Sequence, residues 1–311
     1  MGYGEIIGSA FRITWRNRYL WFFGVFAGAG ANIPTPNPGV GNFDYKGPDT
    51  ANAAAPAWAQ AATPDPGLLV AIGLGVLLLV AVLVVLSLVS QGALADSVAA
   101  IDRGGERRFG TAWKAGTRHF WRVLGLVALL LAIILAVIIV VGAPLAGVVI
   151  AVFSTTEALG VRIAVGIVAG LIALAALLLL FIPLQIVGHL ALRELVLREE
   201  RPVASLRRSY RLFRAHLGKS LLLLVIQIGI AIGATIALVL AALLVGLILF
   251  LPTIGLAIGG LETAAIVTGV LAGGVLVSLV VVAYGAVGAF NHAYWTLAYL
   301  RLGRLPTETG T

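Results

Sequence analysis

The chain has 311 residues, of which 60% are hydrophobic and only 11% are charged, and its formal net charge is +8. A mean hydropathy of +1.07 lies far above the range of soluble globular proteins, so the composition predicts an integral membrane protein. Because the chain contains no cysteine, disulfides, thiolate nucleophiles and cysteine-ligated metal sites are excluded.

The first apolar stretch, residues 19–33, is short and follows Arg12, Arg16 and Arg18. A helix needs about 20 residues to cross about 30 Å of hydrocarbon, and this stretch has fewer. A basic flank with small residues at 27–31 is also typical of a secretory signal peptide. We interpret residues 19–33 as an uncleaved first span, with a signal sequence as the alternative.

A loop and five longer apolar runs follow. Residues 31–67 are rich in proline and alanine and predict an extended loop on the outer face. The runs contain no Asp, Glu, Lys or Arg and comprise residues 68–94, 123–153, 163–192, 221–251 and 264–290. Continuous apolar runs without period-two alternation favour helices over barrel strands. The sequence therefore predicts an all-α integral membrane protein with six transmembrane helices.

Three segments of the chain share one pattern. "IGSAFRITWRN" begins at Ile7, "FGTAWKAGTRH" at Phe109 and "LRRSYRLFRAH" at Leu206, so the copies recur about every 100 residues. Each copy has a small residue, an aromatic residue and a base in the same order. This order predicts a basic amphipathic helix lying in the membrane interface. Ordinary juxtamembrane loops with positive charge are the alternative.

In the second copy, a helical period of 100° per residue places the bases opposite an apolar stripe. The stripe consists of Phe109, Trp113, Gly116 and Phe120. We expect residues 109–120 to form an interfacial helix that buries this stripe among acyl chains or against the bundle.

The repeat divides one membrane domain, residues 1–311, into three units that each consist of an interfacial helix and a helical hairpin. The units are residues 1–105, which include the loop 31–67, residues 106–200 and residues 201–303, and a cytoplasmic tail follows at 304–311. All units have the same orientation, so the repeat is parallel and differs from the inverted repeat of many transporters.

The bases predict the orientation and the partners. Of the 21 Lys and Arg residues, all except Lys46 and Arg162 fall on the side of both termini, which the positive-inside rule makes cytoplasmic. We expect a multi-pass protein of the bacterial plasma membrane that contacts anionic lipid of the inner leaflet. The expected lipid-contacting bases are Arg12, Arg16, Lys114, Arg118, Arg122, Arg207, Arg208, Arg211 and Arg214. A membrane-protein partner or a homo-oligomer stays open, and nucleic acid is not expected as a partner.

Few polar residues accompany the spans. Asp96, His189, Asn291 and His292 lie at the cytoplasmic ends of the even-numbered spans, and they form a polar mouth if those ends converge, with Asp96 near His292. Ordinary interfacial residues reaching water are the alternative. The four His are widely separated without an HxxxH or HExxH pattern, so no metal, cofactor or catalytic residues are predicted.

Three glycine pairs with GxxxG spacing occur in the last three spans. They are Gly166 with Gly170, Gly229 with Gly233, and Gly269 with Gly273. Such pairs allow close helix approach, and we expect them to pack within the bundle.

The segments "GSAFR" and "GTAWK", together with spans that end in glycine, resemble an uncharacterised bacterial family of polytopic membrane proteins. That family is similar to the membrane domain found fused to glycerophosphodiester phosphodiesterases. The catalytic barrel of those fusions is absent here, so the resemblance implies a membrane domain without phosphodiesterase activity.

Two functions fit these observations. The first is a non-enzymatic, lipid-engaging scaffold or assembly partner. The second is a transporter or channel for a small amphipathic or lipid solute. A closed bundle favours the scaffold, whereas a continuous lipid-lined groove favours the transporter.

Overall fold

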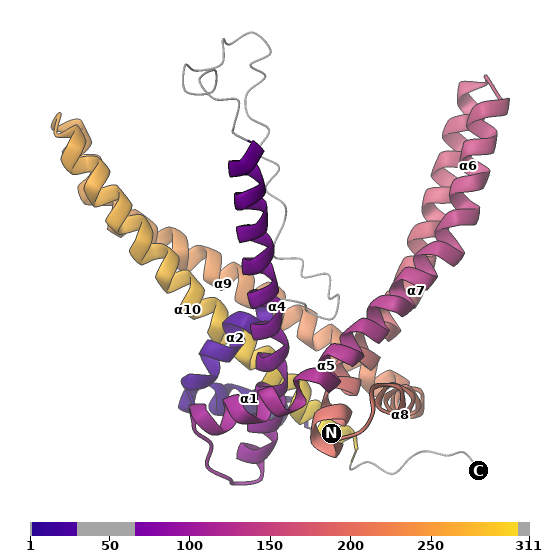
Figure 1. Cartoon of the computed structure of the whole chain (residues 1–311), viewed down its shortest axis with the longest axis horizontal. Helices are drawn as coiled ribbons and strands as arrows, with labels where there is room; N and C mark the ends of the chain where they lie inside the picture. The colour runs from indigo at the N-terminus through magenta and orange to yellow at the C-terminus, as the bar shows by residue number, and fades with distance from the viewer. Residues whose placement is uncertain (1, 30–65, 304–311) are drawn as a thin grey trace.

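The computed structural model describes residues 2–29 and 66–303, and every regular element in these ranges is a helix (Figure 1). The elements are α1 (Tyr3–Arg16), α2 (Tyr19–Ala29), α4 (Pro66–Asp102), α5 (Phe109–Val137), η1 (Ile138–Gly142), α6 (Ala143–Thr155), α7 (Leu159–Arg198), α8 (Pro202–Ala215), α9 (Leu217–Ile258) and α10 (Glu262–Leu302). The all-α class predicted from the sequence is confirmed.

Within residues 2–29 and 66–303, five helical paths are long and apolar enough to cross a membrane, in agreement with the multi-pass membrane protein predicted from the sequence. They are α4, the continuous path from α5 through η1 to α6, then α7, α9 and α10. With 42 residues, α9 is about 63 Å long, roughly twice the hydrocarbon thickness. Part of each long helix therefore extends beyond the hydrocarbon.

The first predicted span is described only in part. Its described portion, α2, has 11 residues and is about 16 Å long, which is half the hydrocarbon thickness. Residues 30–33 lie outside the described residues, as does the tail 304–311. The predicted outer loop 31–67 also lies outside them, except that Pro66 and Gly67 begin α4.

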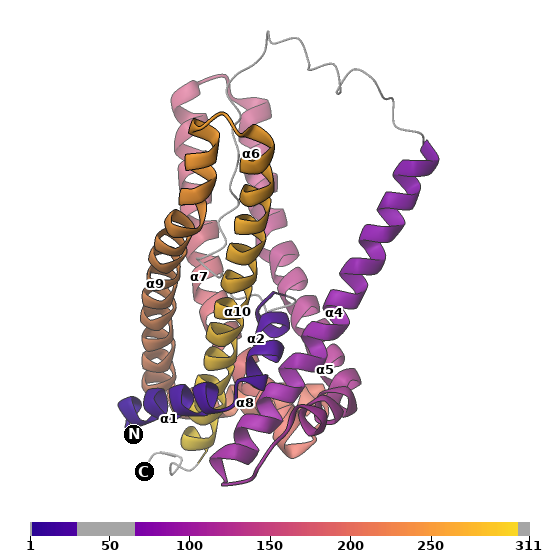
Figure 2. The same ribbon diagram turned by 90° about the vertical axis from the view of Figure 1, so that its left-hand side faces the viewer.

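The long helices meet at one end and diverge at the other (Figures 1 and 2). We call the packed end the base. It comprises α1, α2, α8, the first half of α5 and residues 87–99, 185–196 and 289–302, which hold almost all of the buried core. We call the diverging ends the arms: the outer half of α4, the α6–α7 hairpin and the α9–α10 hairpin.

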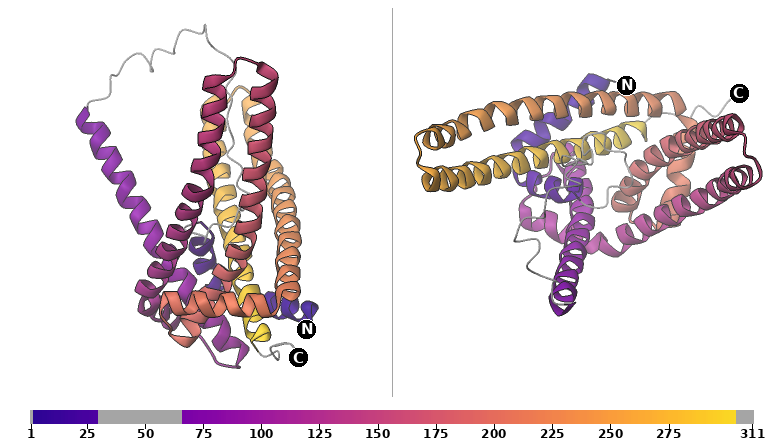
Figure 3. Two further views of the ribbon diagram at one scale, coloured as in Figure 1. Left: turned by 90° about the vertical axis from the view of Figure 1, so that its right-hand side faces the viewer. Right: turned by 90° about the horizontal axis from the view of Figure 1, so that it is seen from above.

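The base and the arms differ in how their helices are oriented. In Figure 2, α1 runs across the direction of the arms, and α8 does the same in the left view of Figure 3. The outer half of α4 stands alone, and residues 69–85 are all exposed along it. Since apolar side chains cover this segment on every side, it is suited to acyl chains rather than water.

A proline explains the irregular turn between α5 and α6. Pro144 has no N–H, and its ring clashes with the carbonyl of Val140 four residues earlier. The chain accommodates this with the wide π turn Ile138–Gly142, after which the helix continues.

The copies of the repeated pattern end differently. In α1 and α8 the helix stops at Asn17 and His216, which hold similar backbone angles (φ −116°, ψ 69° and φ −133°, ψ 44°) before the next helix starts. His119 occupies the equivalent position in the second copy but lies inside α5. Residues 109–120 are helical as expected, and in this copy the helix continues directly into its span without a break.

Close helix crossings occur at glycines other than the predicted pairs. A Cβ atom on Gly24 of α2 would lie 1.9 Å from the carbonyl oxygen of Gly285 in α10, so these two backbones touch. No neighbouring atom would lie within 4 Å of a Cβ on Gly166, Gly170, Gly229 or Gly233, so those pairs do not pack against helices. Of the predicted pairs, Gly269 and Gly273 alone contact another helix, through side chains of α9.

Candidate functional site

The centre of the base holds an arginine between two histidines. The fully buried Arg193 of α7 lies with Nη1 3.3 Å from Nδ1 of His189 and with Nη2 3.4 Å from Nδ1 of His292 in α10. Arg193 also donates to the His189 carbonyl oxygen at 2.7 Å. Since arginine only donates, each Nδ1 that faces it accepts, and both imidazoles are neutral in this arrangement. The contact joins α7 to α10.

No carboxylate pairs with Arg193 in the described part of the chain. The adjacent Glu194, also buried, points elsewhere: it accepts a hydrogen bond from the hydroxyl of Tyr299 and pairs with Arg198 and Arg208, each at 3.3 Å. Glu194 therefore ties α7 to α10 and α8. Neutral acceptors stabilise Arg193, because hydrogen bonds from a charged donor are stronger than those between neutral groups.

The structure brings together only two members of the predicted polar mouth. The ends of α4, α7 and α10 pack on one another in the base. His189 and His292 meet through Arg193, whereas Asp96 pairs with Arg107 at 2.8 Å. Asn291 accepts a hydrogen bond from Gln227 at 3.1 Å. Asp96 and His292, which we expected to approach each other, therefore have different partners: Arg107 for Asp96 and Arg193 for His292.

Sequence reasoning missed Arg193 as a member of this cluster. The third predicted run ends at residue 192, so Arg193 was counted among the bases of the cytoplasmic side. The signal that could have found it is its spacing: Arg193 lies four residues after His189, which places both on one helix face.

The nine bases expected to contact lipid separate into two groups. Three form ion pairs within the protein: Arg118 and Arg122 with Glu199, at 2.7 and 3.7 Å, and Arg208 with Glu194 and Glu200. The side chains of the other six form no hydrogen bond or ion pair with the described residues; they are Arg12, Arg16, Lys114, Arg207, Arg211 and Arg214. These six remain accessible to an external anion.

The face of the repeated helices that packs on the protein is built from small residues. Ala10, Ala112 and Ser209 occupy the same position of the pattern and are all buried. In α5 a Cβ atom on Gly116 would lie 2.3 Å from the carbonyl oxygen of Val89, so α5 touches α4 there. The buried face therefore shares Gly116 with the predicted apolar stripe, whereas Phe109 of that stripe is exposed.

The aromatic residues of the pattern lie mostly outside. Phe11, Tyr210 and Phe109 are exposed, and Trp113 is half-buried. Trp and Tyr side chains accumulate at membrane–water interfaces, where an amphipathic ring is favoured. The exposed aromatics beside unpaired bases fit a helix surface that meets lipid headgroups.

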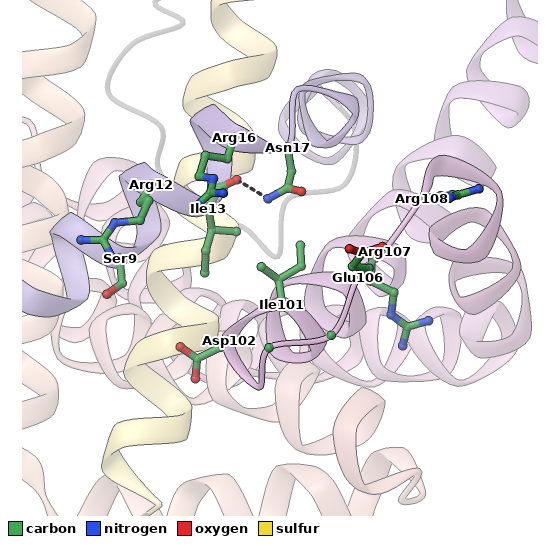
Figure 4. A pocket seen from close by; sticks show the side chains of 12 residues that line it. Ser9, Arg12, Ile13, Arg16, Asn17, Ile101, Asp102, Glu106, Arg107 and Arg108 are labelled. Carbon is green, nitrogen blue, oxygen red and sulfur yellow. Dashed lines mark hydrogen bonds between the residues drawn. The ribbon is translucent and has the colours of Figure 1, made fainter.

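A cleft of about 580 Å³ opens between α1 and the connection from α4 to α5. Figure 4 shows Arg12 and Arg16 on the α1 wall and Asp102 on the opposite wall. Within residues 2–29 and 66–303, no group of three or more His, Asp or Glu side chains could hold a metal ion.

Comparison with known proteins yields one match. No curated protein and no solved structure matches the chain. The model of one protein family matches residues 50–302, a stretch that contains every helix from α4 to α10 and makes up most of the chain. On this match, the protein belongs to the family described as a domain of unknown function (DUF7847).

Proposed function

We propose that this protein is a non-enzymatic scaffold of the bacterial plasma membrane that engages anionic lipid of the inner leaflet through its base. One observation carries the proposal: six bases on α1, α5 and α8 are unpaired, and exposed aromatic side chains lie beside them. An anionic leaflet attracts each nearby Lys or Arg by about 1 kcal/mol. The buried Arg193 cluster joins α7 to α10, and the adjacent Glu194 joins α7 to α8, which carries three of these bases.

The proposal includes six spans in three parallel units with both termini cytoplasmic. The matching backbone angles at Asn17 and His216 support the repeat, since an interfacial helix passes into a span at both positions. The unpaired bases support the orientation, because all of them lie at the base, and the positive-inside rule assigns such an end to the cytoplasm.

Lipid transport is the second candidate, and the divergence of the arms favours it. Apolar side chains are exposed along the α6–α7 and α9–α10 hairpins, so acyl chains can enter between the arms. The base is closed by a dense core around Trp295 and Arg193 and presents an obstacle to passage at that end. This closure is the reason to prefer the scaffold.

Two variants of α8 test the lipid contact. Arg207, Arg211 and Arg214 replaced together by Gln should lower the amount of anionic lipid that co-purifies with the protein, because three unpaired bases are lost. The thermal midpoint of unfolding should not change. Arg208→Gln is the matched control: it removes one base from the same helix but breaks the pairs with Glu194 and Glu200, so it should lower the midpoint and leave most of the anionic lipid bound.

The result that contradicts lipid engagement is a triple variant that keeps its anionic lipid and only inserts in the wrong orientation. Transport has its own assay. Proteoliposomes that contain the protein should move fluorescent phospholipid between leaflets no faster than empty liposomes do. Faster movement would contradict the scaffold and support the transporter function.

A further inference from the structure

The cleft between α1 and the α4–α5 connection carries charges of both signs. Arg12 and Arg16, one helical turn apart on α1, line it, and Arg108 lines it from the connection. Asp102 and Glu106 line it from the connection. None of these five side chains forms an ion pair with another described residue. The fourth arginine of the cleft, Arg107, is already paired with Asp96.

We propose that this cleft binds the headgroup of a zwitterionic phospholipid, with the phosphate at the arginines of the α1 wall and the ammonium at the acidic wall that contains Asp102 and Glu106. Arginine binds phosphate oxygens through several donors at once, and carboxylates accept from an ammonium group. A ligand with one negative and one positive charge can bind the arginines and the carboxylates of the cleft at the same time. A purely anionic headgroup meets the arginines but also two carboxylates that repel it.

The volume of the cleft fits this ligand class. Small-molecule sites are typically about 300–1,000 Å³, and about 580 Å³ accommodates a phosphate, an ammonium and the carbons between them.

The surroundings of the cleft favour a lipid over a soluble amine phosphate. Phe11 and Trp15, the residues just before Arg12 and Arg16, are 57% and 53% exposed and stack on one another at 5.6 Å. Their rings offer an apolar surface beside the arginines, where the first carbons of acyl chains can lie. This inference rests on the proposed function, because it needs the base to meet the inner leaflet.

Native mass spectrometry of the delipidated full-length protein measures the binding. The probes are dioleoyl phosphatidylethanolamine, dioleoyl phosphatidylglycerol and soluble phosphoethanolamine. We expect phosphatidylethanolamine to fill one site that soluble phosphoethanolamine does not fill at the same concentration. The double variant Arg12→Gln with Arg16→Gln should lower the affinity of this site for phosphatidylethanolamine about five- to 25-fold. This range is the product of the losses expected for two partly exposed charge contacts.

The acidic wall gives the sharper test. The double variant Asp102→Asn with Glu106→Gln should lower the affinity for phosphatidylethanolamine about two- to fivefold. It should raise the affinity for phosphatidylglycerol, because the carboxylates that repel an anionic headgroup are gone. The zwitterionic assignment is overturned if the affinities for the two lipids change equally in this variant. It is also overturned if phosphatidylglycerol fills the native cleft as well as phosphatidylethanolamine does. If soluble phosphoethanolamine binds as tightly as the lipid, the lipid source is overturned.

The triple variant of Arg207, Arg211 and Arg214 separates this inference from the proposed function. Those arginines lie outside the cleft, so the triple variant should keep the phosphatidylethanolamine site while losing anionic lipid. Unchanged anionic lipid with a cleft that responds as expected contradicts the surface proposal alone. All these variants alter exposed or half-buried side chains, so the unfolding midpoint checks that each one folds.

Discussion

Within one helix of this protein, identical residues have opposite surroundings. Leu179 in the arm of α7 is 80% exposed, whereas Leu190 in the base is fully buried, although α7 is continuous between them. In a membrane the arm leucine contacts acyl chains and the base leucine contacts protein. Acyl chains are as apolar as leucine, so the hydrophobic effect does not draw the arms together.

What joins the elements at the base is a set of close glycine crossings and buried polar contacts. At the base, Gly24 and Gly116 let backbones touch, and Arg193 bonds with groups on α7 and α10. The outer part of α4 has exposed apolar side chains throughout residues 69–85. Close packing and buried hydrogen bonds therefore hold the helices together at the base.

The largest effect should come from identical substitutions in the two regions. Leu190→Ala should lower the free energy of unfolding by about 2–5 kcal/mol, since it leaves a cavity in the base. Leu179→Ala, on the same helix, should change it by less than about 0.5 kcal/mol, because no protein packs there. Denaturant titration of both variants in one detergent measures the difference, and equal losses would show that the arms also pack tightly.

The sequence predicted the helices well because the signal for a span is strong and local. Each of the five apolar runs lies inside a described helical path, and the absence of charged residues alone defines it. The arrangement of helices was less predictable. Gly229 and Gly233 have the spacing of a packing motif but touch no other helix, whereas Gly24 and Gly28 have the same spacing and lie against α10. Helix contacts depend on which faces meet, and spacing within one helix does not determine that.

An intermediate effect should follow from alanine at a crossing. In Gly24→Ala the new methyl would lie 1.9 Å from the Gly285 carbonyl oxygen, so α2 and α10 must separate. Overpacking of this kind costs about 1–3 kcal/mol. Hydrogen exchange in α2 should rise, and the contact of the Tyr284 hydroxyl with the Gly28 carbonyl oxygen, 3.1 Å, should be lost.

The control for this crossing is Gly229→Ala. It introduces the same methyl where no atom lies within 4 Å, and alanine favours a helix over glycine by up to about 1 kcal/mol. The free energy of unfolding should be unchanged or slightly higher. A stable Gly24→Ala variant with unchanged exchange in α2 would contradict the close crossing.

The candidate site was predicted only in its residue types. The sequence placed His189 and His292 at neighbouring helix ends, but their partner Arg193 looked like a flanking cytoplasmic base. The sequence repeat also does not predict which bases form ion pairs within the protein. Arg208 and Arg211 look equivalent along α8, yet only Arg208 reaches acidic residues, because Glu194 and Glu200 come from the end of α7 and the segment that follows it. A long-range contact decides their roles.

The smallest effect, which separates paired from unpaired bases, is expected for two residues one turn apart on α5. Arg118 pairs with Glu199 at 2.7 Å, whereas Lys114 has no partner in the described chain. Arg118→Gln should cost about 0.2–1 kcal/mol of unfolding free energy, as exposed pairs do, and the cost should shrink as salt screens the pair. Lys114→Gln should leave unfolding unchanged at any salt concentration and reduce bound anionic lipid. If both variants lose lipid equally with no change in stability, then the pair with Glu199 does not hold Arg118 away from the leaflet, and all the bases of α5 act as one surface.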